Sequence, residues 1–200
     1  MLCGLVVHVN NIKKYMKEQY KVIKNLISKE TAEFIGLYFL NLQNFYKGRT
    51  DDHQTPGAPS YYGHSVNETL LVMILEDLKK HSGLDLHPTY SYLRVYTKGD
   101  DLFFHKDRES CEISCTINLK QSHPWPIYMD GKRLILHPGD ACLYKGMEVE
   151  HGRHPFEGDY CIQVFCHYVN THLDHIDDKF KNPNRKRFIT NLGQKDIDEK

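Results

Sequence analysis

The sequence predicts an α+β protein that is mainly β: a jelly roll, or a related double-sheet barrel, with N-terminal helices packed outside it. Three observations predict this class. Apolar residues recur at helical spacing in two segments between residues 28 and 82. From residue 88 to residue 170 the period changes to two, and short strand-like runs follow at a spacing of roughly ten residues. The length of 200 residues is enough for one such domain with its own core.

Two helices are expected before the strands. The first begins at Ser28, a residue type that caps helix N-termini, and the Pro- and Gly-rich segment 48–60 ends it. Its apolar positions share one helical stripe: Phe34, Ile35, Tyr38, Leu42 and Phe45. The second begins at Ser65, because Ser65 and Glu68 have the spacing of a capping box, and it ends near Gly83.

The strand-like runs cover residues 90–96, 112–119, 125–129, 133–136, 141–144 and 160–169. Residues 11–24 indicate a marginal helix or the approach to a strand. The segment 171–200 is polar, with a basic cluster typical of a solvated surface, and is expected to form a C-terminal helix or tail. We therefore expect one domain over residues 1–170, with helices at about 28–82 and the barrel at about 88–170.

Composition excludes several classes of function. The chain has 26 basic and 26 acidic residues, so it lacks the basic footprint of a nucleic-acid-binding protein. No apolar run is long enough to span a membrane, and no basic segment precedes the apolar N-terminus as in a signal peptide. The six cysteines form no CxxC pair, which favours buried thiols in a cytoplasmic protein. The 13 histidines point towards metal chemistry.

A histidine and an aspartate one residue apart make a candidate metal site. Alternate side chains of a strand share a face, so His105 and Asp107 can hold one ion, and an iron site of the oxygenase type needs two imidazoles and one carboxylate. The same spacing occurs at 172–174 and 175–177, but no later strand offers those pairs a third ligand. His151 lies on a later strand and completes the first pair. His154 is its rival, but Pro155 makes His154 a turn residue.

The ordered motifs around this pair resemble those of a known family. They are YSYLRVYTKG at 90–99, HKDRESCEIS at 105–114, WPIY at 125–128, PGD at 138–140, HGR at 151–153 and QVFCHY at 163–168. Over roughly residues 28–170 the chain resembles the Fe(II)/2-oxoglutarate-dependent oxygenases, in particular the prolyl-4-hydroxylase-like branch of bacteria and phages. The resemblance implies a double-stranded β-helix core and Fe(II) bound by His105, Asp107 and His151. It also implies 2-oxoglutarate and O2 as co-substrates, succinate and CO2 as products, and a role for ascorbate as in the family.

The residue that anchors the distal carboxylate of 2-oxoglutarate departs from the family pattern. The family carries a basic residue on the last core strand, nine or ten positions after the second histidine, where this chain has Tyr160 and Cys161. Arg153 is the first substitute, because it should point the same way as His151 two residues earlier. Lys120 is the second, because another branch of the superfamily keeps an anchoring lysine there. A surface salt bridge is the alternative role for Arg153.

Further residues are expected around the same cavity. Tyr96 matches the family tyrosine that hydrogen-bonds the co-substrate. Gln163 is a polar residue in an otherwise apolar strand, which indicates either a pocket contact or a side chain at the edge of the strand ladder. Tyr92 and Arg94 share the face of Tyr96 and are candidates to line the cavity or meet the substrate. Plain core packing is the alternative role for these tyrosines. Arg108, beside the metal motif, either meets the substrate or pairs with a neighbouring glutamate.

The sequence therefore predicts a dioxygenase that hydroxylates a protein side chain, prolyl residues being the best-known target of the family, or a small molecule. A membrane partner is excluded, a nucleic-acid partner is disfavoured, and the oligomeric state is not predicted. Two alternatives stay open at this point. One is a cupin-like metalloenzyme that does not use 2-oxoglutarate, although cupins favour an HxH pair. The other is a catalytically degenerate barrel that acts as a binding module.

Overall fold

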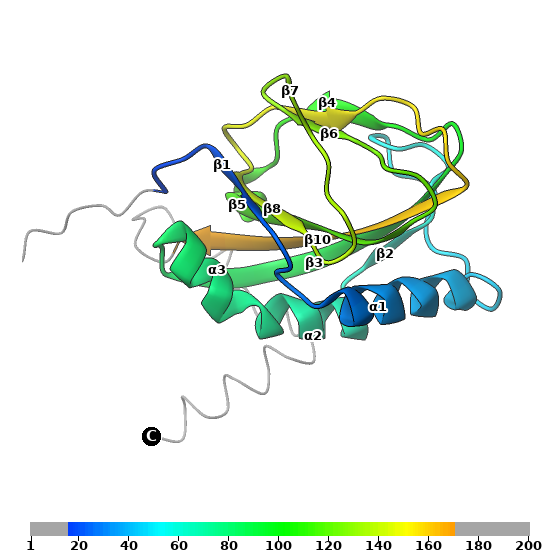
Figure 1. Ribbon diagram of the computed structural model, residues 1–200, viewed down its shortest axis with the longest axis horizontal. Helices are drawn as coiled ribbons and strands as arrows, with labels where there is room; N and C mark the ends of the chain where they lie inside the picture. Colours follow the sequence, from blue (N-terminus) through cyan, green and yellow to red (C-terminus); the bar gives the residue numbers. More distant parts are fainter. Residues whose placement is uncertain (1–15, 171–200) are drawn as a thin grey trace, which may run out of the picture.

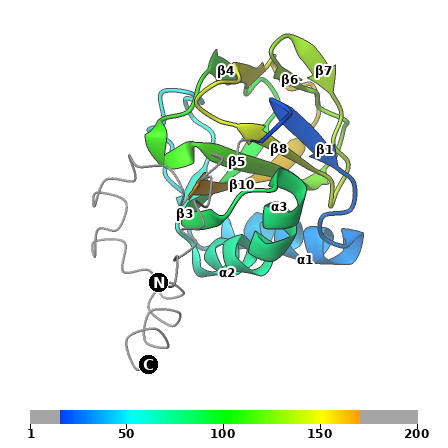
Figure 2. The ribbon, with the colours of Figure 1, turned by 90° about the vertical axis from the view of Figure 1, so that its left-hand side faces the viewer.

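The computed structural model describes residues 16–170, which form two antiparallel sheets with helices on the outer face of the larger one (Figure 1, Figure 2). The larger sheet has the order β1-β8-β5-β10-β3-β2 and the smaller sheet the order β4-β9-β6-β7. The strands of the larger sheet are β1 (Tyr20–Ile23), β2 (Ser60–Tyr62), β3 (Leu86–Thr97), β5 (Ile113–Gln121), β8 (Ala141–Lys145) and β10 (Tyr160–Asn170). Those of the smaller sheet are β4 (Leu102–His105), β6 (Ile127–Met129), β7 (Lys132–Leu134) and β9 (His151–Arg153). The predicted double-stranded β-helix is confirmed.

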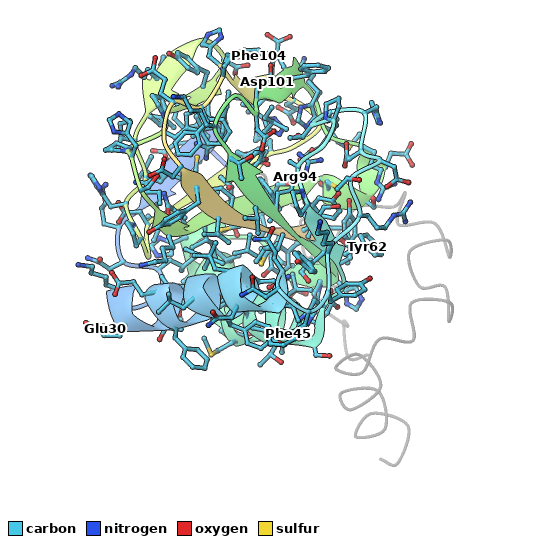
Figure 3. The ribbon with its side chains drawn as sticks, turned by 90° about the vertical axis from the view of Figure 1, so that its right-hand side faces the viewer. Glu30, Phe45, Tyr62, Arg94, Asp101 and Phe104 are labelled. Atoms are coloured by element: carbon cyan, nitrogen blue, oxygen red, sulfur yellow. The ribbon has the colours of Figure 1, made fainter. Side chains whose placement is uncertain are left out.

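The first helix, α1 (Lys29–Leu42), begins as predicted. The Ser28 Oγ accepts a hydrogen bond from the Thr31 backbone N–H at 3.1 Å. The predicted apolar stripe is only partly right, because the buried face consists of Ala32, Ile35, Gly36 and Phe39. Phe34 and Phe45 are 70% and 90% exposed, and Figure 3 shows Phe45 on the helical side of the molecule, far from Phe104.

The second predicted helix is two helices, α2 (Ser65–Met73) and α3 (Leu75–Ser82), which meet at Ile74. The capping-box prediction was wrong. His64 Nδ1 caps α2 by accepting from the Val66 N–H, whereas Glu68 is buried and accepts hydrogen bonds from the backbone N–H and the hydroxyl of Ser91 at 2.8 and 2.7 Å. Glu68 therefore ties α2 to β3. The predicted end at Gly83 is confirmed, with a left-handed φ of 70°.

The alternation of side chains along β3 and β10 divides the interior into two compartments. One face of each strand, with Leu93, Val95 and Val164, packs under the helices in the main hydrophobic core. The other face of β3, with Tyr92 and Tyr96, points into the space between the two sheets. The candidate site lies in this second compartment.

Two of the described strands, β2 and β4, lie outside the predicted strand-like runs, because three or four residues are too few to show a period of two. The strand expected at His151 is β9. Five described cysteines are free and buried: Cys111, Cys115, Cys142, Cys161 and Cys166. Within residues 16–170 no helix has the length and apolar character needed to cross a membrane. The predicted C-terminal segment, its basic cluster and the two other HxD pairs lie outside the described residues.

Candidate metal centre

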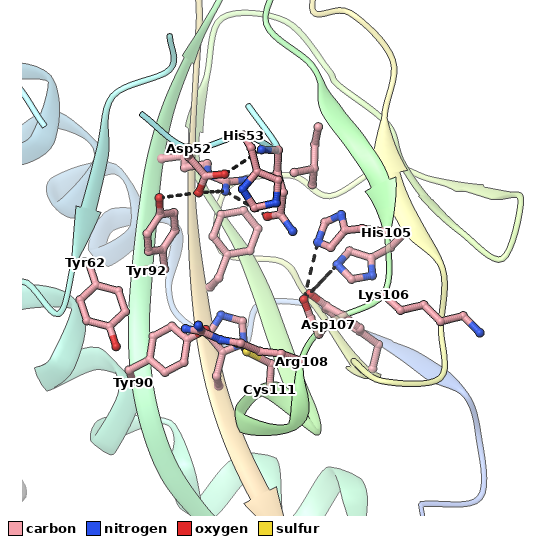
Figure 4. Close-up of a pocket in the computed structure, with 17 residues that line it drawn as sticks. Asp52, His53, Tyr62, Tyr90, Tyr92, His105, Lys106, Asp107, Arg108 and Cys111 are labelled. Carbon is pink, nitrogen blue, oxygen red and sulfur yellow. Dashed lines mark hydrogen bonds and ion pairs between the residues drawn. The ribbon is translucent and has the colours of Figure 1, made fainter. Parts of the chain in front are cut away.

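A pocket of about 370 Å³ opens between the two sheets (Figure 4). Its walls come from β3, β4, β10, the turn after β4 and the loop that follows α1. Its lining is rich in ionisable and aromatic side chains, among them Asp52, Tyr90, Tyr92, Arg94, His105, Asp107, Arg108, Cys111, Tyr144, His151, Phe165 and His167.

The three predicted metal ligands converge at one side of this pocket. Asp107 Oδ1 lies 3.6 Å from His105 Nε2 and 3.7 Å from His151 Nε2. One possible ligand atom from each residue lies within 4.8 Å of the other two. A divalent ion with ligand bonds of roughly 2.1 Å reaches any two atoms less than about 4.2 Å apart, so the carboxylate and each imidazole are close enough to share it.

The backbone fixes the tautomer of both imidazoles. His105 Nδ1 lies 2.7 Å from the carbonyl oxygen of Phe103, and His151 Nδ1 lies 3.0 Å from that of Val149. Because a carbonyl oxygen can only accept, each Nδ1 carries the hydrogen and each Nε2 keeps its lone pair. Both lone pairs are therefore available on the nitrogen atoms that lie near Asp107. Backbone carbonyls are common outer partners of metal-binding histidines.

Ser114 determines which oxygen of Asp107 is available. Its hydroxyl donates to Asp107 Oδ2 at 2.7 Å, and it lies 2.9 Å from His167 Nδ1. With the hydroxyl hydrogen directed to the carboxylate, His167 is the donor to Ser114 Oγ. The backbone N–H of Asp107 donates to the Gly146 carbonyl at 2.8 Å. These contacts leave Oδ1 towards the histidines.

The charge states suit a cation site. Burial alone would raise the pKa of the Asp107 carboxyl, but the close approach of His105, the imidazoles of His167 and His151 and the hydroxyl of Ser114 together outweigh burial and bring it to about 2. Burial lowers the pKa of His151, and it lowers that of His167 to about 4. At neutral pH the site therefore presents an ionised carboxylate at Asp107 and a neutral imidazole at His151, which are the forms that bind a metal ion.

An ion pair stands across the pocket from these residues. Arg94 Nη2 donates to Asp52 Oδ2 at 2.6 Å and to Gln54 Oε1 at 3.2 Å, and Tyr92 donates to the same Asp52 oxygen at 2.9 Å (Figure 4). The predicted inward direction of Tyr92 and Arg94 is thus what the structure shows. Their polar atoms hold the loop after α1 against β3.

Arg108 and Tyr90 form the lower wall in Figure 4. Arg108 Nη2 donates to the Tyr90 hydroxyl at 3.0 Å, and the guanidinium lies over the Tyr90 ring at 5.2 Å. The Tyr90 hydroxyl lies 2.9 Å from Cys111 Sγ. Among the described residues no ion pair of Arg108 with a glutamate occurs.

Arg153 is fully buried behind the centre, with 2% exposure. Its Nη1 donates to the Trp125 carbonyl at 2.6 Å, and the guanidinium lies 4.7 Å from the Trp125 ring centre. Its Nε and Nη2 are buried without a hydrogen-bond partner, as is the hydroxyl of Tyr96. Within residues 16–170 no carboxylate pairs with this guanidinium, which excludes the surface salt bridge as its role there.

Two predicted co-substrate contacts need correction. A β-bulge between β5 and β10 pairs Ile162 with Lys120, so Lys120 turns to the helical face and packs against Gly36 of α1. Tyr160 packs against the main core, also on the helical face. Neither lies in the compartment of the site. Gln163 does point inward, where its Oε1 accepts from Thr116 at 3.4 Å and its Nε2 donates to Cys161 Sγ at 3.2 Å.

Asp52, Cys111 and His167 also line the pocket, although the sequence did not predict them as site residues. His167 could have been found, because it lies four positions after Gln163 on one strand and so shares its face. Asp52 could not, because a loop of that length carries no periodic signal.

No protein-family model matches the sequence, and no curated protein matches it significantly. Solved structures do match. The Pseudomonas putida prolyl-4-hydroxylase has a TM-score of 0.62 at 13% identity, over 77% of this chain and 94% of its own. Viral collagen prolyl hydroxylase vCPH from Paramecium bursaria Chlorella virus-1, in its 2-oxoglutarate complex, has a TM-score of 0.59 at 11% identity, over 76% and 96%. HygX from Streptomyces hygroscopicus, with nickel, 2-oxoglutarate and hygromycin B bound, has 0.58 at 14%, over 82% and 90%.

These matches define the class of fold. The chain has the fold of the Fe(II)/2-oxoglutarate oxygenases, with prolyl 4-hydroxylases of a virus and a bacterium among its structural matches. It also carries a candidate His-Asp-His triad in the compartment between the sheets.

Proposed function

We propose that this protein is an Fe(II)- and 2-oxoglutarate-dependent dioxygenase. Its substrate is a C–H bond of a protein side chain, such as a prolyl residue, or of a small molecule. The observation that carries the proposal is the convergence of His105, Asp107 and His151 in an open pocket, with neither Nε2 bearing a hydrogen. Five free, buried thiols support a reducing compartment, the cytoplasm.

The donor set fits Fe(II). Two neutral imidazoles and one ionised carboxylate are the ligands of mononuclear non-haem iron sites that keep positions open for other molecules. His105 ends β4, Asp107 lies two residues beyond it, and His151 begins β9, the strand that pairs with β4. A rigid strand pair therefore holds two of the three ligands in register.

The interior also fits an anionic co-substrate. A buried guanidinium whose Nε and Nη2 lack acceptors is costly unless an anion binds to it, and Arg153 is such a group. Carboxylates are the natural partner of a forked guanidinium. When bound, iron and 2-oxoglutarate supply an oxidation by O2 that releases succinate and CO2 and hydroxylates the substrate.

The chain's own residues prepare the site for that chemistry. Ser114 holds Asp107 Oδ2, so that one carboxylate oxygen remains for the ion, and the backbone keeps both imidazoles in the binding tautomer. The Tyr144 hydroxyl lies 3.3 Å from His151 Nε2. Tyr92 and Phe165 add aromatic surface to the pocket wall.

The test is iron-dependent conversion of 2-oxoglutarate to succinate by the purified protein. We expect turnover in the wild type, loss in His105→Ala and retention in His172→Ala, which changes another HxD pair. No turnover in the wild type, or equal loss in both variants, would contradict the proposal. Metal binding without turnover would favour the cupin-like or degenerate barrel. A screen of peptides and amino acids for a mass gain of one oxygen then identifies the substrate.

A further inference from the structure

We propose that Arg153, on β9, binds the distal carboxylate of 2-oxoglutarate in place of a basic residue on β10. The need for an anion at this position follows from Arg153 itself. The identity of that anion rests on the proposed function.

The guanidinium of Arg153 is built into the interior with donors left over. It is 2% exposed, one of its nitrogen atoms donates to the Trp125 carbonyl, and Nε and Nη2 have no acceptor. Native interiors rarely leave a buried charge uncompensated, because its desolvation is costly. Nε and Nη2 form one edge of the guanidinium, which is the edge that a carboxylate binds with two parallel hydrogen bonds. The buried, unpaired hydroxyl of Tyr96 offers a further donor in the same compartment.

The other basic residues considered for this role are excluded by their contacts. Arg94 already donates to Asp52 and Gln54, so its charge has a partner. Lys120 lies on the helical face of the sheet, against Gly36. The Nε of Arg94 is also buried without a partner, but its charge is paired with Asp52. Among the three, Arg153 alone is buried in the compartment of the site with no carboxylate partner among the described residues.

Arg153 takes over the region where the family places its cation. The guanidinium of Arg153 lies 4.7 Å from the ring centre of Trp125, and Trp125 belongs to the same buried cluster as Tyr96 and Cys161 of β10. Cys161 faces the interior beside Tyr96, its partner on β3. The cation therefore enters this region from the smaller sheet, while a small thiol on β10 leaves space for it.

The spacing along β9 suits a dicarboxylate. Arg153 follows the candidate ligand His151 by two residues, and both side chains are buried between the sheets. Two residues of a strand span roughly 6 to 7 Å, which is about the length of an extended five-carbon dicarboxylic acid. One end of such a molecule can lie at the triad while the other meets the guanidinium. The open pocket ends short of Arg153, so entry of the anion requires the side chains between them to rearrange.

The experiment compares two keto acids that differ at the distal end. Calorimetry on Ni(II)-loaded protein measures the Kd of 2-oxoglutarate and of 2-oxobutyrate, which has the same keto-acid head and no distal carboxylate. We expect the wild type to bind 2-oxoglutarate more tightly by roughly tenfold to a hundredfold, the range for charge-assisted hydrogen bonds. In Arg153→Met this preference should vanish, while the Ni(II) affinity stays unchanged.

A relocated cation provides the rescue. The double variant Arg153→Met/Cys161→Lys returns the charge to β10 and should restore at least part of the preference for 2-oxoglutarate. Lys120→Met is the matched control, because it removes a cation from the opposite face of the sheet and should leave the preference intact. Without ligand, Arg153→Met should unfold at the same temperature as the wild type or higher, because it removes a buried unpaired charge. In the wild type, but not in the variant, 2-oxoglutarate should raise that temperature more than 2-oxobutyrate does.

Failure of the inference is distinguishable from failure of the proposed function. A wild-type protein that binds neither Ni(II) nor 2-oxoglutarate overturns the proposed function and the inference with it. A protein that binds both, but has equal affinity for the two keto acids, overturns only the role of Arg153. A preference that survives in folded Arg153→Met does the same. If Arg153→Met does not fold, the wild-type comparison still decides whether a distal-carboxylate site exists. The Ni(II)-loaded Arg153→Lys variant then takes the place of Arg153→Met. We expect its preference for 2-oxoglutarate to be weaker than that of the wild type, and an unchanged preference would overturn the role of Arg153.

Discussion

Replacing Ser114 by alanine should weaken metal binding without removing any ligand. The hydroxyl donates to Asp107 Oδ2 at 2.7 Å, a short charge-assisted bond that keeps the carboxylate oriented. Outer partners of metal ligands typically contribute tenfold to a hundredfold in affinity, about 1.4 to 2.7 kcal/mol. The variant also leaves the buried His167 Nδ1 without its partner, which should destabilise the fold by about 1 to 3 kcal/mol.

Calorimetric titration with Ni(II) measures the first effect, and urea unfolding of the metal-free protein measures the second. Thr116→Ala is the matched control. It removes a hydroxyl two residues further along β5 on the same inward face, where the partner is Gln163 rather than a candidate ligand. Its Ni(II) affinity should stay within about twofold of the wild type, which is about 0.4 kcal/mol. A folded Ser114→Ala protein with wild-type affinity would refute the idea that the serine orients Asp107.

Three further predictions concern stability. Burial lowers the pKa of His167 from about 6.5 in the unfolded chain to about 4 in the fold. Between these two pH values the unfolded state therefore binds more protons than the folded state. The free energy of unfolding should fall by at most about 3 kcal/mol as the pH drops through this window. Urea unfolding of metal-free protein should show a shallower pH dependence in His167→Asn, and an identical slope would contradict the assignment. A Cβ at Gly146 would overlap the carboxylate of Asp107, so Gly146→Ala should lower both the melting temperature and the Ni(II) affinity; a change in neither would count against the close packing. Glu68→Ala should cost about 1 to 3 kcal/mol in thermal or urea unfolding, because Ser91 loses the acceptor for a buried N–H, whereas Glu68→Gln keeps an acceptor and should cost less.

The sequence was sufficient for the fold class and for the proximity of the candidate ligands, because both depend on local periodicity. Helix-spaced and strand-spaced runs predicted the layers, and alternation placed Tyr92, Arg94 and Tyr96 on one face of β3. The order of motifs placed His151 opposite His105, and the two residues are partners between β4 and β9.

Errors arose where a single residue changes the pattern or where a side chain has a long-range partner. One extra residue in the bulge of β5 turned Lys120 to the helical face, and no local signal marks that bulge. Glu68 has the spacing of a helix cap, but its carboxylate accepts hydrogen bonds from Ser91, 23 residues later. Asp52 reaches the pocket through its ion pair with Arg94, which depends on the path of a loop.

The two faces of β3 have different roles, and this limits which changes of sequence the strand can accept. Residues such as Leu93 and Val95 serve the hydrophobic support, while their immediate neighbours Tyr92 and Arg94 serve the cavity. Point substitutions at the cavity positions can thus alter what the molecule recognises and leave its foundation intact. A deletion of one residue within the strand would exchange the two faces. Arg94 would then point into the hydrophobic core and Leu93 into the pocket. Substitutions in β3 can therefore accumulate during evolution only while the number of residues in the strand stays the same.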